Sequence, residues 1–401
     1  MRYKCCNLLT EGIEFRYNGV ALCQRVDHVG GGDIVVQTYD DKKDKKFNFD
    51  INKYFKKRQE VIEQNKSGNI YHKCEGCIEL HERDWPELEN QKISQMILHH
   101  WTKCNSHCIY CYTNQNKEYY NNRKSYKILP ILKQMDKRKI LDFGGKCSFA
   151  GGEISCLPEF EKIVKILDKY DWVPIFNSSC VKYEKTVEKH LKNGNGMLIV
   201  SVDCGNKDLH KKIKQADTFD IVWKNISKYA NAAKHKYMIY TKYIILKDIN
   251  DNEQSITEYL EMSKKSKIEY VLMEIDHYYF LDNRENIPKY IIDLFYFAYN
   301  KAQEMGLKCE IYSNASVLLL QGKWADSFWK PYVFDAGKEI DKYLFRHVLK
   351  VDSNKNTIEY ESIKTAAEDN SLTYIQIWKT CERNKKKNTH KISGNIYYYK
   401  S

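Results

Sequence analysis

The 401-residue sequence carries a formal net charge of +12, and 42% of its residues are hydrophobic, enough for a sizeable core. This composition excludes fibrous and disordered proteins, and the length suits two or three domains or one α/β barrel with appendages. No apolar run approaches the roughly 18–20 residues that cross a bilayer, and the N-terminus lacks the apolar stretch of a secretory signal. The sequence therefore predicts a cytoplasmic protein with no membrane partner.

The excess positive charge comes from lysine, with 55 Lys against 10 Arg. Sequence-specific recognition of bases and phosphates relies on the two-pronged geometry of arginine, which is scarce here. The lysines are scattered among asparagines and tyrosines. This pattern favours a solvated lysine-rich surface, with a nucleic-acid partner as the less favoured alternative.

Residues 1–92 hold five of the 14 cysteines and few long apolar runs, which predicts a small metal-stapled domain. Within this segment, residues 12–23 are typical of two strands around a turn at Asn18-Gly19. In a chain without an export signal, clustered cysteines more often bind metal or do chemistry than form disulfides.

From residue 93 onward, short β-rich runs alternate with amphipathic stretches, which is typical of βα units and a parallel sheet. The predicted strands are Gln95–Trp101, Lys146–Phe149, Val173–Phe176, Met197–Val202, Met238–Leu246 and Tyr270–Ile275. The predicted helices are Tyr126–Lys137, Glu159–Tyr170, Lys182–Lys192, Phe219–Ala233, Gln254–Lys264 and Lys289–Met305.

Six βα units are fewer than the eight of a complete TIM barrel. The fold predicted for residues 93–307 is therefore a partial (β/α)6 barrel of the α/β class, preceded by the small domain of residues 1–92. Residues 308–401 begin with a strand-like run, Cys309–Tyr312, and are predicted to form an α/β extension to which no motif assigns a role.

The strongest chemical signal is a C-x3-C-x2-C motif, formed by Cys104, Cys108 and Cys111 directly after the first predicted barrel strand. Three thiolates hold three irons of a cubane cluster and leave the fourth iron open to a small molecule. The alternative is a zinc site completed by His100 or His107. Zinc sites favour C-x2-C pairs, so this spacing favours the cluster.

A C-x3-C-x-aromatic-C loop after the first strand of a six-unit barrel resembles the radical S-adenosylmethionine (SAM) superfamily. The resemblance implies that SAM binds the open iron and is cleaved reductively to methionine and a 5′-deoxyadenosyl radical. It also implies that Tyr110 packs near the adenine.

Further residues match the superfamily in order along the chain. Gly151, Gly152 and Glu153 resemble its GGE motif, in which the glutamate accepts hydrogen bonds from the SAM ammonium group. By the same resemblance, the predicted contacts of SAM also include Asn177, Ser201 and Asp203 at strand ends, with residues 243–251 bordering the adenine. Lys242 is either a contact of the SAM carboxylate or a surface lysine.

Cys6, Cys23, Cys74 and Cys77 form a second possible ligand set, with Cys5 as an alternative to Cys6. Four thiolates suit either a closed 4Fe–4S cluster or structural zinc. The set resembles the SPASM or twitch module, which implies an auxiliary cluster. That module normally follows the barrel, whereas here the cysteines precede it.

These features predict a radical SAM enzyme that oxidises or cross-links a peptide or protein side chain and draws electrons from an external donor such as flavodoxin or ferredoxin. The alternatives are oxidation or epimerisation of a sugar or other small polyol, with Cys204 as hydrogen donor, and modification of RNA or a nucleotide. A non-enzymatic metal-binding protein is a further alternative. Cys204 is otherwise a packing residue. Because successive strand residues face opposite ways, at most one of His99 and His100 faces into the barrel.

Overall fold

The computed structural model describes residues 2–23, 34–40, 43–44, 46–77, 80–85, 92–111, 125–283, 287–312, 333–334, 348–352, 356–360, 391–392 and 395–399. The chain divides into two compact units, Met1–Phe334 and Asp335–Ser401. Among the described residues, no helix combines the length and the apolar character needed to cross a bilayer.

The first unit is built on a sheet that has 11 strands in the described residues, in the order β13-β12-β11-β10-β9-β8-β7-β6-β2-β3-β4. Every neighbouring pair from β13 to β2 is parallel, and the pairs β2–β3 and β3–β4 are antiparallel. The strands are β2 (Gly12–Arg16), β3 (Gly19–Ala21), β4 (Val35–Thr38), β6 (Ile93–His99), β7 (Leu141–Phe149), β8 (Val173–Ser178), β9 (Met197–Ser201), β10 (Ile239–Ile245), β11 (Tyr270–Ile275), β12 (Lys308–Tyr312) and β13 (Val333–Phe334).

Helices connect most of the parallel strands, because parallel neighbours need long crossover connections. The α-helices in the described residues are α1 (Asn7–Glu11), α2 (Ile51–Lys66), α5 (Leu129–Lys137), α6 (Phe160–Asp168), α7 (Lys185–Asn193), α8 (Lys207–Lys214), α9 (Phe219–Ala232), α10 (Glu253–Lys265), α11 (His277–Asn283) and α12 (Lys289–Glu304). Side chains cap several helix N-termini: Asp50 caps α2, Asn206 caps α8 and Asn252 caps α10.

The predicted partial barrel is confirmed. The six predicted barrel strands correspond to β6 to β11, and the six predicted helices correspond to α5, α6, α7, α9, α10 and α12. Helix α8 was not predicted, because its sequence, Lys207–Lys214, is dominated by charged residues and only three of its side chains are buried. Local periodicity is a strong signal only where a helix presents a broad apolar face.

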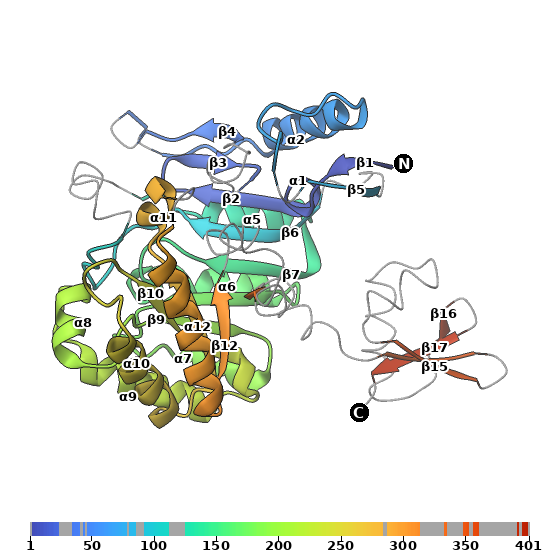
Figure 1. Cartoon of the computed structure of the whole chain (residues 1–401). Helices are drawn as coiled ribbons and strands as arrows, with labels where there is room; N and C mark the ends of the chain where they lie inside the picture. The colour runs from blue at the N-terminus through green and yellow to red at the C-terminus, as the bar shows by residue number, and fades with distance from the viewer. Residues whose placement is uncertain are drawn as a thin grey trace. The chain divides into compact units, whose positions relative to one another are not determined.

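Strands of the N-terminal segment extend the barrel sheet itself (Figure 1). Strand β2 pairs in parallel with β6, from Gly12 opposite Gln95 to Arg16 opposite His99. The hairpin between β2 and β3 turns at Tyr17-Asn18, one residue earlier than predicted, because Arg16 pairs with Gly19. The C-terminal end of β2 therefore reaches the same edge of the sheet as the end of β6. The predicted domain boundaries at 92/93 and 307/308 stay predictions.

Two smaller sheets complete the described structure. Strands β1 (Arg2–Cys5) and β5 (His81–Asp84) form an antiparallel pair in the first unit. In the second unit, β14 (Val348–Val351), β15 (Thr357–Tyr360), β16 (Lys391–Ile392) and β17 (Asn395–Tyr399) form an antiparallel sheet in the order β15-β14-β17-β16.

Candidate active site

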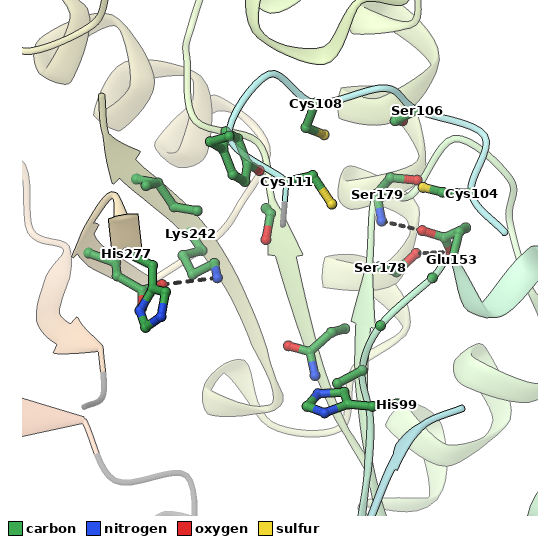
Figure 2. Close-up of a pocket in the computed structure, with 18 of the residues that line it drawn as sticks. His99, Cys104, Ser106, Cys108, Cys111, Glu153, Ser178, Ser179, Lys242 and His277 are labelled. Carbon is green, nitrogen blue, oxygen red and sulfur yellow. Dashed lines mark hydrogen bonds and ion pairs between the residues drawn. The ribbon is translucent and has the colours of Figure 1, made fainter. Parts of the chain in front are cut away.

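A cavity of about 670 Å³ lies at the C-terminal ends of the parallel strands. Active sites of βα barrels gather at this edge, because the loops after the strands surround it. The predicted site residues that line the cavity are Cys104, Cys108, Tyr110, Cys111, Gly151, Gly152, Glu153, Asn177, Ser201 and Lys242 (Figure 2). The structure therefore brings together residues from the segments that follow β6 and β7 and from β8, β9 and β10.

The three cysteines of the C-x3-C-x2-C motif are partly exposed to this one cavity. Burial raises the pKa of the Cys104 thiol to about 12 and also raises the pKa of Cys108, so a metal that binds here must displace the protons of these thiols. In the described part of the chain, no three metal-binding side chains are close enough to hold one ion. In a cubane cluster each cysteine binds a different iron atom, so the three thiols need not meet at one ion.

The two glycines of the GGE motif allow the turn after β7 to pack tightly against the start of the cysteine loop. The amide of Gly152 donates to the carbonyl of Trp101 at 2.6 Å, and the amide of Glu153 donates to that of Lys103 at 2.9 Å. Gly151 has φ +89°, and a Cβ there would lie 2.7 Å from the Trp101 oxygen. Residues with side chains would push the loop away, so the glycines position the cysteines.

The side chain of Glu153 is buried and joins β7 to β8. Its carboxylate accepts hydrogen bonds from the Ser178 hydroxyl at 2.8 Å and the Ser179 amide at 2.6 Å. Ser179 in turn contacts Asn105 in the cysteine loop at 3.0 Å. Glu153 therefore stabilises the wall of the cavity. It also lines the cavity. Its predicted contact with the SAM ammonium group remains a prediction.

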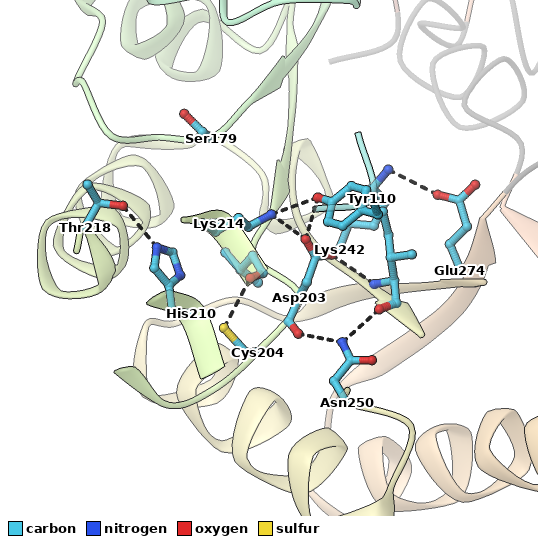
Figure 3. Close-up of polar contacts among 12 residues, drawn as sticks. Tyr110, Ser179, Asp203, Cys204, His210, Lys214, Thr218, Lys242, Asn250 and Glu274 are labelled. Carbon is cyan, nitrogen blue, oxygen red and sulfur yellow. Dashed lines mark hydrogen bonds and ion pairs between the residues drawn. The ribbon is translucent and has the colours of Figure 1, made fainter. Parts of the chain in front are cut away.

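A buried polar network anchors the other side of the cysteine loop (Figure 3). The Tyr110 hydroxyl donates to the Asp203 carboxylate at 2.6 Å, and Lys214 donates to the Tyr110 oxygen at 2.8 Å and forms an ion pair with Asp203. Burial is the main cause that raises the pKa of Tyr110, and the neighbouring Asp203 raises it further. The phenol therefore remains a neutral donor. Amides of His107 and Ile109 also donate to the last carbonyls of α8, at 3.0 Å each.

Asp203 has a different environment from the one its strand-end position suggested. It has φ +61°, is fully buried and is absent from the cavity lining, because its carboxylate also accepts from the Ile244 amide at 2.9 Å. The Asn250 amide donates to the Asp203 carbonyl at 3.0 Å. These contacts bind together the loops after β9 and β10, and the predicted contact of Asp203 with SAM remains a prediction.

Asn177, Ser201 and Lys242 lie on the cavity wall. The Asn177 amide donates to the Phe149 carbonyl at 3.0 Å, which fixes its orientation at the end of β8. Lys242 of β10 forms an ion pair with Glu274 of β11 at 3.1 Å (Figure 3). Burial raises the pKa of Glu274, and the ion pair opposes that shift. Lys242 is thus a cavity residue rather than a surface lysine.

Cys204 lies outside the cavity lining and inside an apolar cluster. Its side chain is fully buried among Ile213, Ile244 and Leu246, and its thiol points to the Val202 carbonyl at 3.4 Å. Burial raises the pKa of this thiol to about 12. The surroundings are those of a packing cysteine.

Four of the five N-terminal cysteines are buried together in the first unit, with Cys77 partly exposed. Burial raises the pKa of Cys6 well above its ordinary value, and the neighbouring thiols Cys5, Cys23 and Cys74 add to the shift. Burial likewise raises the pKa of Cys74 to about 12, with a further contribution from Cys23. The predicted set is therefore gathered from segments as far apart as residues 6 and 77, and Cys5 lies beside it.

The sequence did not predict one part of the cavity wall, which is formed by Glu14 and Arg16 of β2. His99 of β6 and His277 and Tyr278 of α11 line the same cavity. No motif marks Glu14 or Arg16, because each is more than 80 positions away in sequence from the β6 residue that it pairs with.

Comparison with known proteins places this site in a class. Residues 98–263 match the model of the Radical SAM superfamily. This range begins within β6 and contains the cysteine motif, the GGE turn and the Asp203–Asn250 region. The chain therefore contains a radical SAM domain, and the family implies a 4Fe–4S cluster and SAM as its cofactors. A search of the curated proteins found no match.

Solved structures with a similar fold include SuiB from Streptococcus suis bound to S-adenosylmethionine, with 11% identity, a TM-score of 0.42, and coverage of 66% of this chain and 56% of SuiB. AnSMEcpe with bound AdoMet has 16% identity, a TM-score of 0.41, and coverage of 53% and 62%. A radical SAM methyltransferase from Sphaerobacter thermophilus has 10% identity, a TM-score of 0.36, and coverage of 54% and 65%. This chain thus spans less than two thirds of each, and such low similarity identifies no substrate.

Proposed function

We propose that this chain is a radical SAM enzyme that removes hydrogen from a peptide or protein side chain, with net oxidation or cross-linking as the result. When bound, the cluster and SAM supply a 5′-deoxyadenosyl radical that abstracts a hydrogen atom from an unactivated C–H bond. The observation that carries the proposal is the convergence of Cys104, Cys108 and Cys111 with the GGE turn on one cavity.

The residues of this chain would hold and orient the cofactors. The three thiolates would bind three irons, and Tyr110, fixed by Asp203 and Lys214, would keep their loop against the cavity. The carboxylate of Glu153 retains lone pairs that can accept from an ammonium group. Lys242, already facing the cavity, would meet the SAM carboxylate by exchanging part of its ion pair with Glu274.

Two features support a two-electron outcome over epimerisation. The hydrogen donor proposed for an epimerase, Cys204, is fully buried away from the cavity lining. Cys5, Cys6, Cys23 and Cys74 are close enough to influence one another's pKa, and a second cluster held there could accept the second electron. Reducing equivalents would come from a donor such as flavodoxin or ferredoxin, which suits a cytoplasmic protein.

The substrate class can be tested with a perdeuterated peptide digest, prepared from cells grown in heavy water. Reconstituted protein, SAM and dithionite should transfer deuterium from the digest to 5′-deoxyadenosine, measured by mass spectrometry. A parallel digest of perdeuterated oligosaccharides tests the polyol alternative. Transfer from the oligosaccharides alone would reject the peptide substrate.

Cys204→Ala separates oxidation from epimerisation. We expect the variant to modify its substrate at the wild-type rate, with no solvent deuterium at the reacting carbon, because the thiol is remote from the cavity. Its free energy of unfolding should fall by about 1 kcal/mol, as for other buried truncations. Cys147→Ala, an equally buried cysteine of β7, is the matched control. Solvent deuterium in the wild-type product that disappears in Cys204→Ala would establish epimerisation instead.

Metal analysis tests the N-terminal set. A variant with alanine at Cys104, Cys108 and Cys111 should retain about four irons per chain and no stoichiometric zinc, because the second cluster persists. Adding Cys23→Ala and Cys74→Ala should remove this iron. One tightly bound zinc with negligible iron would rule out an auxiliary cluster and leave SAM cleavage by the wild type unaffected.

A further inference from the structure

Glu14 and His99 form a carboxylate–histidine pair on the cavity wall that β2 adds to the barrel. His99 Nδ1 lies 2.8 Å from Glu14 Oε1. The second oxygen, Oε2, accepts from Arg16 Nε at 2.8 Å, and a second nitrogen of the guanidinium group lies 2.7 Å from it. Only 3% of Glu14 is exposed, whereas the His99 side chain is 32% exposed and lines the cavity. The carboxylate is therefore enclosed, and the imidazole is accessible.

The hydrogen bonds determine which nitrogen of His99 carries the proton. Burial opposes ionisation of Glu14, but the contacts with His99 and Arg16 lower the pKa of its carboxyl. An ionised carboxylate has no proton to donate, so Nδ1 must donate to it. In the neutral imidazole Nε2 then carries a lone pair. In the described part of the chain, no protein group contacts Nε2 through a hydrogen bond.

A structural histidine in the same barrel has a different arrangement. His190 of α7 is 2% exposed, its Nε2 lies 2.9 Å from Asp168, and its Nδ1 lies 2.8 Å from the Thr186 carbonyl. Both of its nitrogens are occupied within the protein. His99 has one nitrogen held by a carboxylate and the other on the side of an accessible cavity, which is the arrangement of a positioned general base.

His99 is also placed away from the cluster ligands. Figure 2 shows it at the opposite end of the cavity view from Cys108 and Cys104. Arg16 continues the network to the N-terminal cysteines, since its Nη2 donates to the Cys23 carbonyl at 3.0 Å. A substrate that lies between the cysteine motif and His99 could thus give a hydrogen atom at one end of the cavity and a proton at the other.

We propose that His99 is a catalytic residue that accepts a proton from the substrate, and that Glu14 is the residue that positions it. This inference rests on the proposed function. The substrate gives one hydrogen atom to the SAM-derived radical, one proton to His99 Nε2 and one electron to an oxidised iron–sulfur centre. The carbon that lost the hydrogen atom forms a new bond to the atom that lost the proton, and the product is two hydrogens lighter.

The first test measures the tautomer of His99 without any activity. In protein labelled with ¹⁵N-histidine, at about pH 8, we expect His99 to carry its proton on Nδ1 and a lone pair on Nε2. Glu14→Gln should shift this population toward the Nε2–H form. Asp168→Asn is the matched control, since it alters His190 and should leave His99 unchanged. A wild-type His99 with its proton on Nε2 would overturn the proposed pair.

The second test uses the perdeuterated peptide digest and His99→Gln. The ratio of oxidised peptide, which lacks one deuterium and one hydrogen, to deuterated 5′-deoxyadenosine should fall by about 10²- to 10⁴-fold. Glu14→Gln should give a smaller loss of the same kind. A wild-type ratio of oxidised peptide to deuterated 5′-deoxyadenosine in His99→Gln would contradict the assignment.

Failure of the proposed function has a separate signature. If wild-type protein transfers no deuterium from the digest, the peptide substrate is wrong, whatever the variants do. The assignment of His99 is then decided by the tautomer measurement, which requires no substrate. Circular dichroism of His99→Gln and Glu14→Gln should match the wild type, which separates loss of the base from loss of the fold.

Discussion

Alanine at Cys104, Cys108 and Cys111 together should abolish the reductant-dependent cleavage of SAM to 5′-deoxyadenosine. All three thiols line the cavity, and without them no iron is held beside the GGE turn. Iron should fall from about eight atoms per chain to about four, if the N-terminal set holds a second cluster. Both quantities can be measured on anaerobically reconstituted protein, by iron assay and by chromatography of the nucleoside.

The matched control is alanine at Cys147 and Cys309, which are buried outside the cavity lining. That double variant should retain its iron and its SAM cleavage. A triple variant that still produced 5′-deoxyadenosine at the wild-type rate would reject the assignment of the cluster to this loop, and with it the proposed function.

Lys214→Met should lower the free energy of unfolding by about 3–5 kcal/mol, because it leaves the buried Asp203 carboxylate without its partner. The side chains of the two residues are 4% and 0% exposed. Burial alone would lower the pKa of Lys214, but Asp203 and the Cys108 thiol raise it, so the amine is charged in the folded protein. Chemical denaturation of the cluster-free protein measures this effect without interference from metal.

Lys207→Met is the control, since Lys207 contacts Asp217 and Asp220 on the surface. Its effect on the free energy of unfolding should be small, as for other exposed ion pairs. Replacing Lys214 and Asp203 together by apolar residues should restore much of the stability that Lys214→Met loses. Equal losses for the buried and exposed lysines would show that the Asp203–Lys214 pair does not stabilise the loop anchor.

The sequence by itself determined the features that depend on neighbouring residues. The cysteine spacing, the GGE turn and the alternation of strands and helices are local patterns, and they predicted the partial barrel and the edge at which its cavity lies. Local patterns also predicted that at most one member of the His99-His100 pair faces into the barrel. His99 lines the cavity and His100 is 1% exposed, because adjacent strand residues point to opposite faces.

Only the tertiary structure decided what depends on contacts between distant segments. The pairing of β2 with β6 brings Glu14 to His99 across 85 positions, and no local signal predicts parallel pairing at that separation. Asp203 and Cys204 follow β9, where the extended pattern suggested cavity residues. The left-handed backbone at Asp203 ends the alternation, so its carboxylate meets Lys214 and Cys204 enters the apolar cluster. Side-chain direction after a strand depends on the turn, which the packing of α8 and β10 selects.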